Sequence, residues 1–420
     1  MEQRVFRFPY GLPENLPDRF TKFDPADFVG KADAFVKRYL KRREKIAVSA
    51  SGGVDSTTVA YLLQRIAGDN IYPFFIDDGL RRVIRGREEW EVTRDVFKDM
   101  TNFRVVHVKE KFLPSLCDLS DGEAKRNVFR ENYTKVSNEI LQELSADWIA
   151  DGTIAPDIIE TEGEVKVKTQ HNVGLPYATK KFELIASLYK PHVRRLGKYL
   201  GIPDKVAFGI PCPGPAEMLR VGGIFTDEKL QIAKIATDVV EQMTDEYCRS
   251  MWSREFQYDE ATGVRTPFQM FGVVVDSWMK ELSALSDFLY EARVKCYKMK
   301  TRTTYIEEGI KRSEPITMPI LWLESEGEHG HENLLNLGKD IWNRFGYPRL
   351  LYQVYDSGRT EGYPVFIRVV ESQDAIVANP MKIDFDYLEK MGKTIAQKNP
   401  LVTKVAYDYS TKPPATIEII

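Results

Sequence analysis

The residues with the clearest capacity for chemistry form one short segment, Ser51-Gly52-Gly53-Val54-Asp55-Ser56. An apolar run at residues 46–48 precedes the segment and a stretch of helical periodicity follows it, which predicts a tight loop between a strand and a helix. Paired glycines let several backbone N–H groups approach one anion, and the start of the helix adds roughly half a positive charge. We therefore predict a phosphate-binding loop in which Asp55 holds Mg²⁺ and hydroxyls are donated by Ser51, Ser56 and Thr57.

Two other interpretations of this loop are weaker. A turn capped by Ser or Asp would explain Ser-Gly-Gly alone, but not the whole hexapeptide at this position. A Walker A loop requires GxxxxGK[ST], and the only GKT of the chain, at 392–394, has Tyr387 where the first glycine must be. The hexapeptide is instead typical of the pyrophosphatase loop, which cleaves ATP between its α and β phosphates. In that chemistry a carbonyl oxygen attacks the α-phosphate, becomes an adenylate and is displaced by a nitrogen or sulfur nucleophile.

The composition of the 420-residue chain narrows the class of protein. Its 59 Lys and Arg against 62 Asp and Glu give a formal charge of −3, which argues against binding of nucleic acid or anionic lipid as the main role. The four cysteines form no CxxC pair, so neither a disulfide framework nor a cysteine zinc site is expected. No signal peptide and no apolar run of about 20 residues is evident. We expect a cytoplasmic protein that contacts no membrane.

The order of the predicted elements indicates two domains. Residues 27–200 alternate strands with helices, which predicts a doubly wound parallel sheet of the α/β class. The predicted strands there are 46–48, 71–76, 103–108 and 147–151, and the helices are 27–41, 55–66, 87–100 and 189–200. Beyond, we predict a smaller α+β unit with helices at 227–245 and 278–299 and strands at 271–275, 350–355, 365–370, 402–409 and 416–420. The predicted division is an extension at 1–27, an ATP pyrophosphatase domain at 28–225 and a second domain at 226–420.

Further segments fall in the order of a known family. They are FIDDGL (75–80) with Arg82, DGEAKR (121–126), GTIAPDIIE (152–160), KTQHNV (168–173), LYK (188–190), GRT (358–360), RVVES (368–372) and KPPATIE (412–418). They run from about residue 28 to 420, with one insertion at about 278–347. On these segments the chain resembles the ATP-pyrophosphatase subunit of GMP synthase, especially the archaeal two-subunit kind.

The resemblance implies an adenine nucleotide alpha hydrolase-like fold followed by a dimerisation domain that helps to bind the substrate. It implies that MgATP adenylates the 2-oxo group of xanthosine monophosphate (XMP), after which ammonia displaces AMP to give GMP. By the same resemblance, ATP is bound by Ser49, Ser51, Gly52, Gly53, Val54, Asp55, Ser56, Thr57, Asp77, Gly79, Arg82, Gly152 and Thr153. Catalysis is expected from Asp55, Ser56, Asp157 and Lys168, with Asp55 also the metal ligand.

The acceptor nucleotide is expected to contact Arg126, His171, Pro211, Cys212, Gly214, Arg220, Arg359, Lys412, Ile417 and Glu418. An ammonium such as that of Lys412 suits a phosphate, and a carboxylate such as that of Glu418 accepts from purine N–H groups. Lys125 and Arg126 belong either to a solvated helix face or to a mobile lid that closes over phosphates. Asp77 and Asp78 either cap a turn or contact the adenosine.

The acceptor loop departs from the family pattern. Where the family has roughly Arg, His or Gln, Pro, Phe, Pro, Gly, Pro, Gly and Leu, residues 209–217 are Gly-Ile-Pro-Cys-Pro-Gly-Pro-Ala-Glu, and Arg220 is retained. A second hypothesis is therefore adenylation of a different purine-like or heterocyclic nucleotide, for amination or thiolation. Cys212 either carries sulfur in a thiolation or is a small buried residue in place of Phe. A third hypothesis is a regulatory paralogue that binds nucleotide without turnover.

The source of nitrogen is expected to lie outside this chain. No cysteine has the context of a glutaminase nucleophile, so ammonia must come from solution or from a separate glutamine amidotransferase subunit. The insertion at about 278–347 either enlarges a homodimer interface or docks that partner. The cofactors we expect are Mg²⁺ and the co-substrate ATP.

Overall fold

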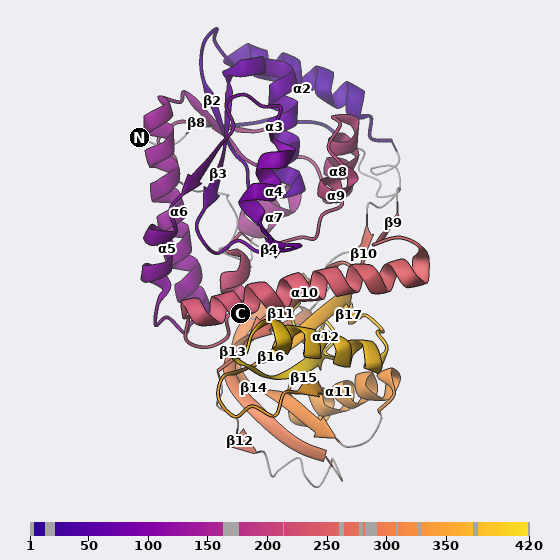
Figure 1. Cartoon of the computed structure of the whole chain (residues 1–420). Helices are drawn as coiled ribbons and strands as arrows, with labels where there is room; N and C mark the ends of the chain where they lie inside the picture. Colours follow the sequence, from indigo (N-terminus) through magenta and orange to yellow (C-terminus); the bar gives the residue numbers. More distant parts are fainter. Residues whose placement is uncertain are drawn as a thin grey trace.

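The structure, a computed structural model, describes residues 4–12, 22–162, 176–212, 214–259, 264–276, 280–281, 292–307, 310–325, 329–372 and 377–418. Two sheets lie on either side of the long helix α10 (Asp227–Trp252), as Figure 1 shows. None of the described helices combines the length and the apolar character needed to cross a membrane.

The first sheet is parallel throughout, which confirms the predicted fold class. Its strand order is β1-β8-β7-β2-β3-β6, with β1 (Val5–Arg7), β8 (Lys180–Glu183), β7 (Trp148–Ala150), β2 (Ile46–Ser49), β3 (Ile71–Asp77) and β6 (Arg104–His107). From β2 the chain continues to β3 and β6 on one side, and later to β7 and β8 on the other. The order therefore reverses beside β2, and open α/β sheets bind ligands beyond the carboxyl ends of their strands at such a point.

The central strand β2 of this sheet follows from apolar sequence, whereas β8, which lies between β1 and β7, does not. All four residues of β2 are buried, as a parallel sheet covered by helices on both faces requires. Strand β8 has the polar-looking sequence Lys-Lys-Phe-Glu and was not predicted. Lys181 and Glu183 are nevertheless buried there, because they form an ion pair at 2.8 Å and Lys181 also lies 2.8 Å from Asp151.

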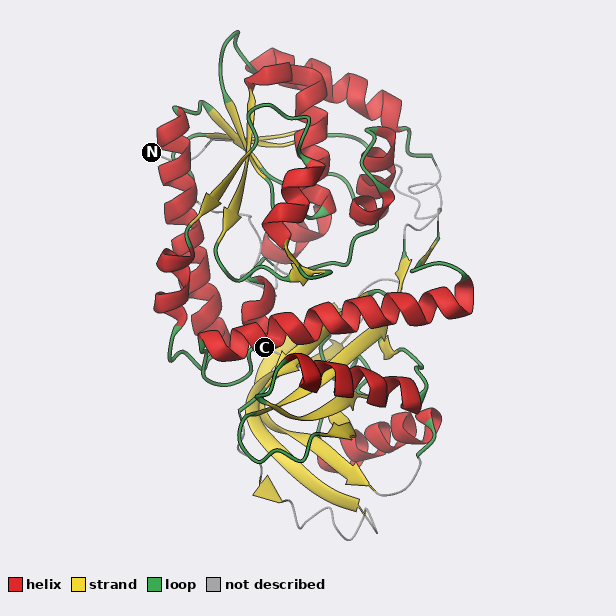
Figure 2. Cartoon of the chain, viewed as in Figure 1, coloured by secondary structure: helices red, strands yellow, loops and turns green. Residues whose placement is uncertain are grey.

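Helices cover both faces of the parallel sheet (Figure 2). They are α2 (Pro25–Tyr39), α3 (Val54–Ala67), α4 (Glu89–Val96), α5 (Lys109–Leu116), α6 (Gly122–Leu144), α7 (Ala155–Glu162), α8 (Lys190–Tyr199) and α9 (Asp204–Ala207). On one face α2, α3 and α8 pack around a core that includes Phe28, Leu62 and Leu196. On the other face α6 contributes Phe129 and Ile140 to a second core. The unit is thus a three-layer α/β arrangement.

The segment expected to form either a solvated face or a lid is the first turn of α6. Asp121 caps this helix, because its Oδ1 accepts from the N–H groups two and three residues later at 3.0 and 2.9 Å. Lys125 is buried, and its Nζ donates to the carbonyl oxygens of Val221 and Gly223 at 2.9 and 2.8 Å. The structure therefore places Lys125 in neither predicted environment: it ties α6 to the segment that leads into α10.

Helix α10 confirms the helix predicted at 227–245 and continues to Trp252. Its start is fixed by Thr226, whose Oγ1 accepts from the N–H of Lys229 at 3.2 Å. Most of its residues are buried, because one continuous core runs from α6 through Val240 of α10 to Phe271 of the second sheet. Packing therefore crosses residue 225, and the predicted domain division there stays an interpretation.

The second sheet is mixed and belongs to the smaller unit. Its strand order is β11-β16-β18-β15-β14-β13-β12, with β17 beside β16. The strands are β11 (Gln269–Val274), β12 (Lys280–Glu281), β13 (Ala292–Glu307), β14 (Ile310–Ser325), β15 (Leu350–Asp356), β16 (Tyr363–Glu371), β17 (Asn379–Pro380) and β18 (Val402–Asp408). Helix α12 (Phe385–Lys398) packs on β15 and β18, α10 packs on β11, and α11 (His331–Phe345) follows β14. The described structure also has two small ribbons, β4 (Val83–Ile84) with β5 (Arg87–Glu88) and β9 (Gln257–Tyr258) with β10 (Arg265–Thr266), and two 3-10 helices, η1 (Gly68–Asn70) and η2 (Ala216–Arg220).

Two predicted elements of this unit are wrong. The helix predicted at 278–299 is contradicted by β12 and by β13, which pairs antiparallel with β14 from Ala292 opposite Ser325 to Glu307 opposite Ile310. The Thr-rich second half of β13 favours a strand, which outweighs the helical spacing of its apolar residues. The strand predicted at 416–420 is absent from its described part, 416–418. There Arg349 Nη2 donates to the carbonyl oxygens that a neighbouring strand would otherwise bind.

Candidate active site

The predicted phosphate-binding loop lies between β2 and α3, at the carboxyl edge of the parallel sheet. Its own polar groups hold its shape. The N–H of Ser51 donates to Ser56 Oγ at 3.0 Å, and the hydroxyls of Ser56 and Thr57 donate to the Gly53 carbonyl at 3.2 and 2.8 Å. Gly52 has a φ of +79°, which glycine adopts without strain. The backbone of this turn and the start of α3 together suit an anion.

A second glycine is pressed against the loop. Gly152 follows β7, and a Cβ added to it would lie 2.6 Å from the backbone nitrogen of Ser56 and 2.9 Å from the carbonyl carbon of Asp55. Only a residue without a side chain allows this approach, so the structure brings Gly152 to the loop. Thr153 turns inward beside it, and its Oγ1 donates to Asp151 Oδ1 at 2.7 Å.

Asp55 is held by a cation from a distant helix. Its Oδ2 lies 2.6 Å from Nζ of Lys190, the first residue of α8. Its Oδ1 is buried and has no hydrogen-bond partner among the described residues. One turn further along α8, burial lowers the pKa of Arg194 to about 10, although Asp55 opposes that shift.

The orphaned oxygen of Asp55 fits a magnesium ion that arrives with ATP. Mg²⁺ is usually bound by one or two carboxylates together with substrate phosphates. No group of three His, Cys, Asp or Glu among the described residues could hold a metal by itself. Asp55 is therefore the group that would hold Mg²⁺, and the phosphates would complete its coordination.

The end of β3 forms a tight turn in which both predicted carboxylates act as caps. Asp77 Oδ1 accepts from the N–H of Gly79 at 3.3 Å, and Asp78 Oδ1 accepts from the N–H of Leu80 at 2.9 Å. Burial raises the pKa of Asp78, although its ion pair with Arg81 at 3.0 Å opposes the shift. The turn-capping alternative is thus observed, and a contact of Asp77 with adenosine stays a prediction.

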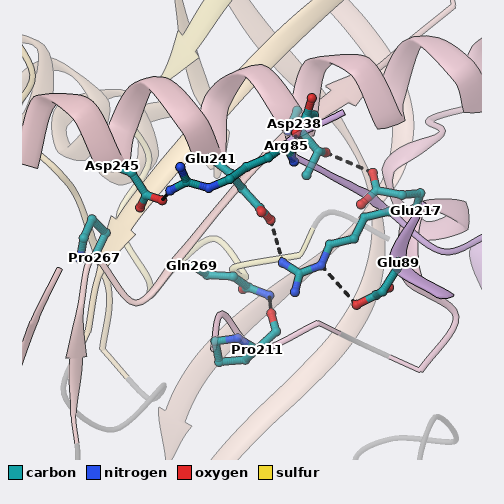
Figure 3. Close-up of polar contacts among 12 residues, drawn as sticks. Arg85, Glu89, Pro211, Glu217, Asp238, Glu241, Asp245, Pro267 and Gln269 are labelled. Carbon is teal, nitrogen blue, oxygen red and sulfur yellow. Dashed lines mark hydrogen bonds and ion pairs between the residues drawn. The ribbon is translucent and has the colours of Figure 1, made fainter. Parts of the chain in front are cut away.

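Arg82 joins the first unit to α10, and its predicted contact with ATP stays a prediction. Its Nη1 lies 2.6 Å from Glu241 of α10 and its Nε lies 3.3 Å from Glu89 of α4. Figure 3 labels these two carboxylates, which lie on the same side of α10. Close by, the backbone N–H of Arg85 donates to the Asp238 carboxylate at 2.6 Å. These contacts fasten the loop after β3 to α10.

Other predicted ATP-site residues have structural partners as well. Asp157 Oδ2 accepts from the N–H of Ile154 at 3.0 Å, at the start of α7. Ser49 Oγ lies 2.6 Å from the hydroxyl of Tyr133 on α6, and Val54 is buried. Lys168 and His171 lie outside the described residues.

Part of the predicted acceptor set gathers around Gln269, the first residue of β11. Gln269 Nε2 donates to the Pro211 carbonyl at 2.8 Å and to Glu418 Oε1 at 2.8 Å. Arg220 Nη2 lies 3.8 Å from the same Glu418 oxygen, and the Arg220 guanidinium lies over the ring of Phe271 at 4.5 Å. We call Pro211, Cys212, Arg220, Gln269 and Glu418 the acceptor cluster.

Burial changes the pKa of two groups at the acceptor cluster, the Cys212 thiol and the neighbouring Glu217 carboxyl group. It raises the pKa of the Cys212 thiol to about 12, although Arg220 and Arg82 oppose the shift. It also raises the pKa of Glu217 to about 7 against the opposing effect of Arg220. A protonated thiol is a poor nucleophile, so the environment of Cys212 favours the packing alternative over sulfur transfer.

The structure does not bring two predicted acceptor arginines to this cluster. Arg126 is buried in α6, and its Nη1 lies 3.3 Å from Glu123. Arg359 follows β15 and donates to the carbonyl oxygens of Ala396 and Val402 at 3.0 and 3.2 Å. Gly214 is exposed.

A pocket of about 540 Å³ lies in the second unit, beside Lys412. It is lined by Leu335, Gly338, Lys339, Trp342, Asn343, Pro348, Leu350, Tyr409, Ser410, Thr411, Pro413 and Pro414. Lys412 is buried between these last residues, and its backbone pairs with that of Ala378. Ile417, further along, is also buried.

Three residues that now stand out received no role from the sequence. Lys190 could have been found from the sequence, because it lies in the LYK segment at the start of the helix predicted at 189–200. Glu217 appeared only as a departure from the family loop. Gln269 could not have been found from the sequence, since nothing in the residues that flank it connects it to residues 211 and 418.

A Ser-Gly-Gly-x-Asp-Ser loop at the point of strand-order reversal in a parallel sheet defines an enzyme of the ATP-pyrophosphatase (PP-loop) class. The family described as "GMP synthase C terminal domain" matches residues 335–419. A subunit of the glutamine-hydrolyzing GMP synthase of Sulfurisphaera tokodaii is 34% identical over 404 residues, which cover 94% of this chain and 99% of that protein. The corresponding subunit from Methanocaldococcus jannaschii is 31% identical, with 94% of this chain and 99% of that protein covered. The chain therefore belongs to this family of GMP synthase subunits.

Among solved structures, an NMN synthetase from Francisella tularensis matches 46% of this chain and 78% of its own chain, at 17% identity and a TM-score of 0.37.

Proposed function

We propose that this chain uses MgATP to adenylate the 2-oxo group of XMP and then aminates that carbon with ammonia, which gives GMP, AMP and pyrophosphate. The observation that carries the proposal is the loop between β2 and α3, where an anion-binding turn adjoins an Asp55 carboxylate with one buried, unpartnered oxygen among the described residues. Such a site suits a phosphate chain with its metal ion. Membership of the GMP synthase family supports the choice of XMP as acceptor.

In the first step the chain binds ATP and stabilises the leaving group. The 2-oxo oxygen of XMP bonds to the α-phosphorus while the bond from that phosphorus to the β-phosphate oxygen breaks. The loop N–H groups and the start of α3 hold the departing pyrophosphate. Asp55 would hold Mg²⁺, which would supply positive charge to the phosphate oxygens. Lys190 holds Asp55 Oδ2, which leaves Oδ1 for that ion.

In the second step ammonia adds to the adenylated carbon, loses its surplus protons and displaces AMP, which keeps the former 2-oxo oxygen. The acceptor cluster supports this step, because Glu418 can accept from a purine N–H and lies beside the loop of Pro211. Lys412 is the proposed contact for the acceptor phosphate. Ser56, Asp157 and Lys168 remain proposed participants in catalysis.

A different heterocyclic nucleotide as acceptor is the second candidate. The observation that favours it is the buried ion pair of Glu217 with Arg220 at 2.6 Å, since Glu217 stands where the family pattern has Leu. Thiolation through Cys212 is less favoured, because burial keeps its thiol protonated.

The relatives are each named as one subunit of a glutamine-hydrolyzing enzyme, which supports a separate glutamine amidotransferase as the partner that supplies ammonia. We also propose that the chain acts as a homodimer through its second unit. The insertion that contains β13 and β14 is the proposed surface for one of these partners.

A product assay tests the function. Purified protein is incubated with MgATP, XMP and ammonium, and AMP and GMP are separated by chromatography beside an Asp55→Ala variant. GMP from the wild type alone is the expected result. AMP without GMP would favour another acceptor, and the absence of AMP under every condition would overturn adenylation.

A further inference from the structure

Glu217 places a buried carboxyl group against Arg220 of the acceptor cluster. It stands where the family pattern has Leu, and its side chain is fully buried. Its Oε1 lies 2.6 Å from Arg220 Nη1, and its Oε2 accepts from Thr237 Oγ1 at 2.9 Å. Figure 3 shows Glu217 in this network beneath α10. Burying a carboxylate costs several kcal/mol unless it is paired, so this pair fixes both side chains.

Gln269 ties three distant segments together. Its amide nitrogen has two hydrogens, and both are used: one on the Pro211 carbonyl and one on Glu418 Oε1, each at 2.8 Å. Gln269 is itself only 5% exposed at the start of β11. The acceptor loop, the second sheet and the C-terminal segment therefore meet at one amide group.

Glu418 is left with one oxygen for a ligand. Its Oε1 is bound by Gln269 and lies 3.8 Å from Arg220 Nη2, whereas its Oε2 is buried without a partner among the described residues. Arg220 is closer to Glu217, at 2.6 Å through Nη1, than to Glu418. The two contacts thus fix the position of Glu418 and keep Oε2 available.

We propose that Glu217 and Gln269 are positioning residues for the acceptor, which hold Glu418 so that its Oε2 accepts an N–H of a lactam, the group that flanks the carbonyl to be adenylated. This inference rests on the proposed function.

Two substitutions remove these contacts by different means. Glu217→Gln keeps the size of the side chain and can keep the bond with Thr237, but it frees the charge of Arg220 to move the short distance to Glu418. Gln269→Met keeps the approximate length and removes both donors without changing any charge. Glu217→Asp retains the charge and should restore part of the wild-type behaviour.

The test is a steady-state comparison of wild type, Glu217→Gln, Glu217→Asp and Gln269→Met with XMP, ATP and ammonium. We expect the KM for XMP to rise about tenfold in Glu217→Gln and Gln269→Met, and the KM for ATP to stay within about twofold. The matched control is Glu44→Gln, which alters a largely buried carboxylate at the opposite end of β2, where it accepts from Trp148 Nε1 at 2.8 Å. Thermal unfolding of each variant identifies loss of fold.

The outcomes separate this inference from the proposed function. If the wild type forms no GMP from XMP, the proposed function fails and the inference falls with it. If the wild type forms GMP but Gln269→Met, folded like Glu44→Gln, keeps the wild-type KM for XMP, only the inference is overturned. Equal increases in the KM for XMP and for ATP would also overturn it, since they indicate a general structural effect.

Discussion

Lys190 Nζ lies 2.6 Å from Asp55 Oδ2, so the carboxylate of the phosphate-binding loop is held by the first residue of a helix 135 positions away in sequence. We expect Asp55→Asn to abolish AMP formation.

Lys190→Gln should keep the fold and lower kcat/KM for ATP roughly ten- to a hundredfold, because Asp55 loses its fixed orientation. Pyrophosphate release measures both effects.

The control for Lys190 is Lys111→Gln, which removes a lysine from an exposed ion pair with Glu139 on the α5–α6 pair of helices. That variant should behave as wild type. A wild-type kcat/KM for ATP in Lys190→Gln would show that Asp55 needs no such partner.

The close approach of Gly152 to α3 predicts a second effect on ATP binding. A Cβ at Gly152 would lie 2.6 Å from the nitrogen of Ser56, so Gly152→Ala must displace the start of α3. We expect a loss of roughly 1–3 kcal/mol in the free energy of unfolding, as for other overpacked sites. We also expect ATP affinity to fall about tenfold or more, measured by calorimetric titration.

Gly30→Ala provides the comparison, because Gly30 lies in helix α2 with open space around it. Alanine is favoured there by up to about 1 kcal/mol, so stability should rise or stay constant and ATP affinity should not change. Unaltered ATP binding in Gly152→Ala would contradict the role given to this contact.

The lowered pKa of buried Lys125 leads us to expect that the free energy of unfolding depends on pH. Burial first, and then the neighbouring ammonium of Lys229, lower the pKa of Lys125 to about 7, although Asp276 and Asp121 oppose the shift. In the unfolded chain a lysine keeps its proton up to about pH 10.4, so between pH 7 and 10 the folded state binds fewer protons than the unfolded state. Stability rises with pH wherever the unfolded state binds more protons. The contribution of Lys125 to the free energy of unfolding is therefore unfavourable near neutral pH and becomes less so as the pH rises through this window.

Urea unfolding of wild type and Lys125→Met at pH 7, 8 and 9 measures this contribution. The wild type should gain about 2 kcal/mol relative to the variant between pH 7 and 9. A difference that does not change with pH would show that Lys125 stays protonated in the folded protein.

The raised pKa of the Cys212 thiol leads us to expect slow alkylation of this residue. Because burial raises the pKa of its thiol to about 12, it should react slowly with iodoacetamide at pH 8, whereas the exposed Cys117 should be labelled readily. Mass spectrometry of the labelled peptides distinguishes the two sites. Cys212→Ala should keep ammonia-dependent turnover within about threefold, and a complete loss would contradict a role in packing alone.

Local sequence determined the parallel sheet and its phosphate-binding loop. Strands β2 and β3 are apolar runs that end in glycine-containing turns, and α10 has a capping Thr followed by an acidic first turn. These signals lie within a few residues of the structure they specify, so they could be interpreted without any knowledge of packing. The same holds for membership of the family, which rests on segments in a fixed order.

Tertiary structure decided what the site residues touch. That Lys190 binds Asp55, that Gly152 fits against Ser56 and that Gln269 joins residues 211 and 418 depends on strand order and register. Lys125 shows most clearly that sequence alone does not reveal the partner of a side chain. Its charged surroundings in the sequence indicated a surface or a lid, yet its side chain is buried and donates to two carbonyl oxygens. A residue's charge is set by its sequence, but its partner and its solvation are set by whichever distant segments the fold packs beside it.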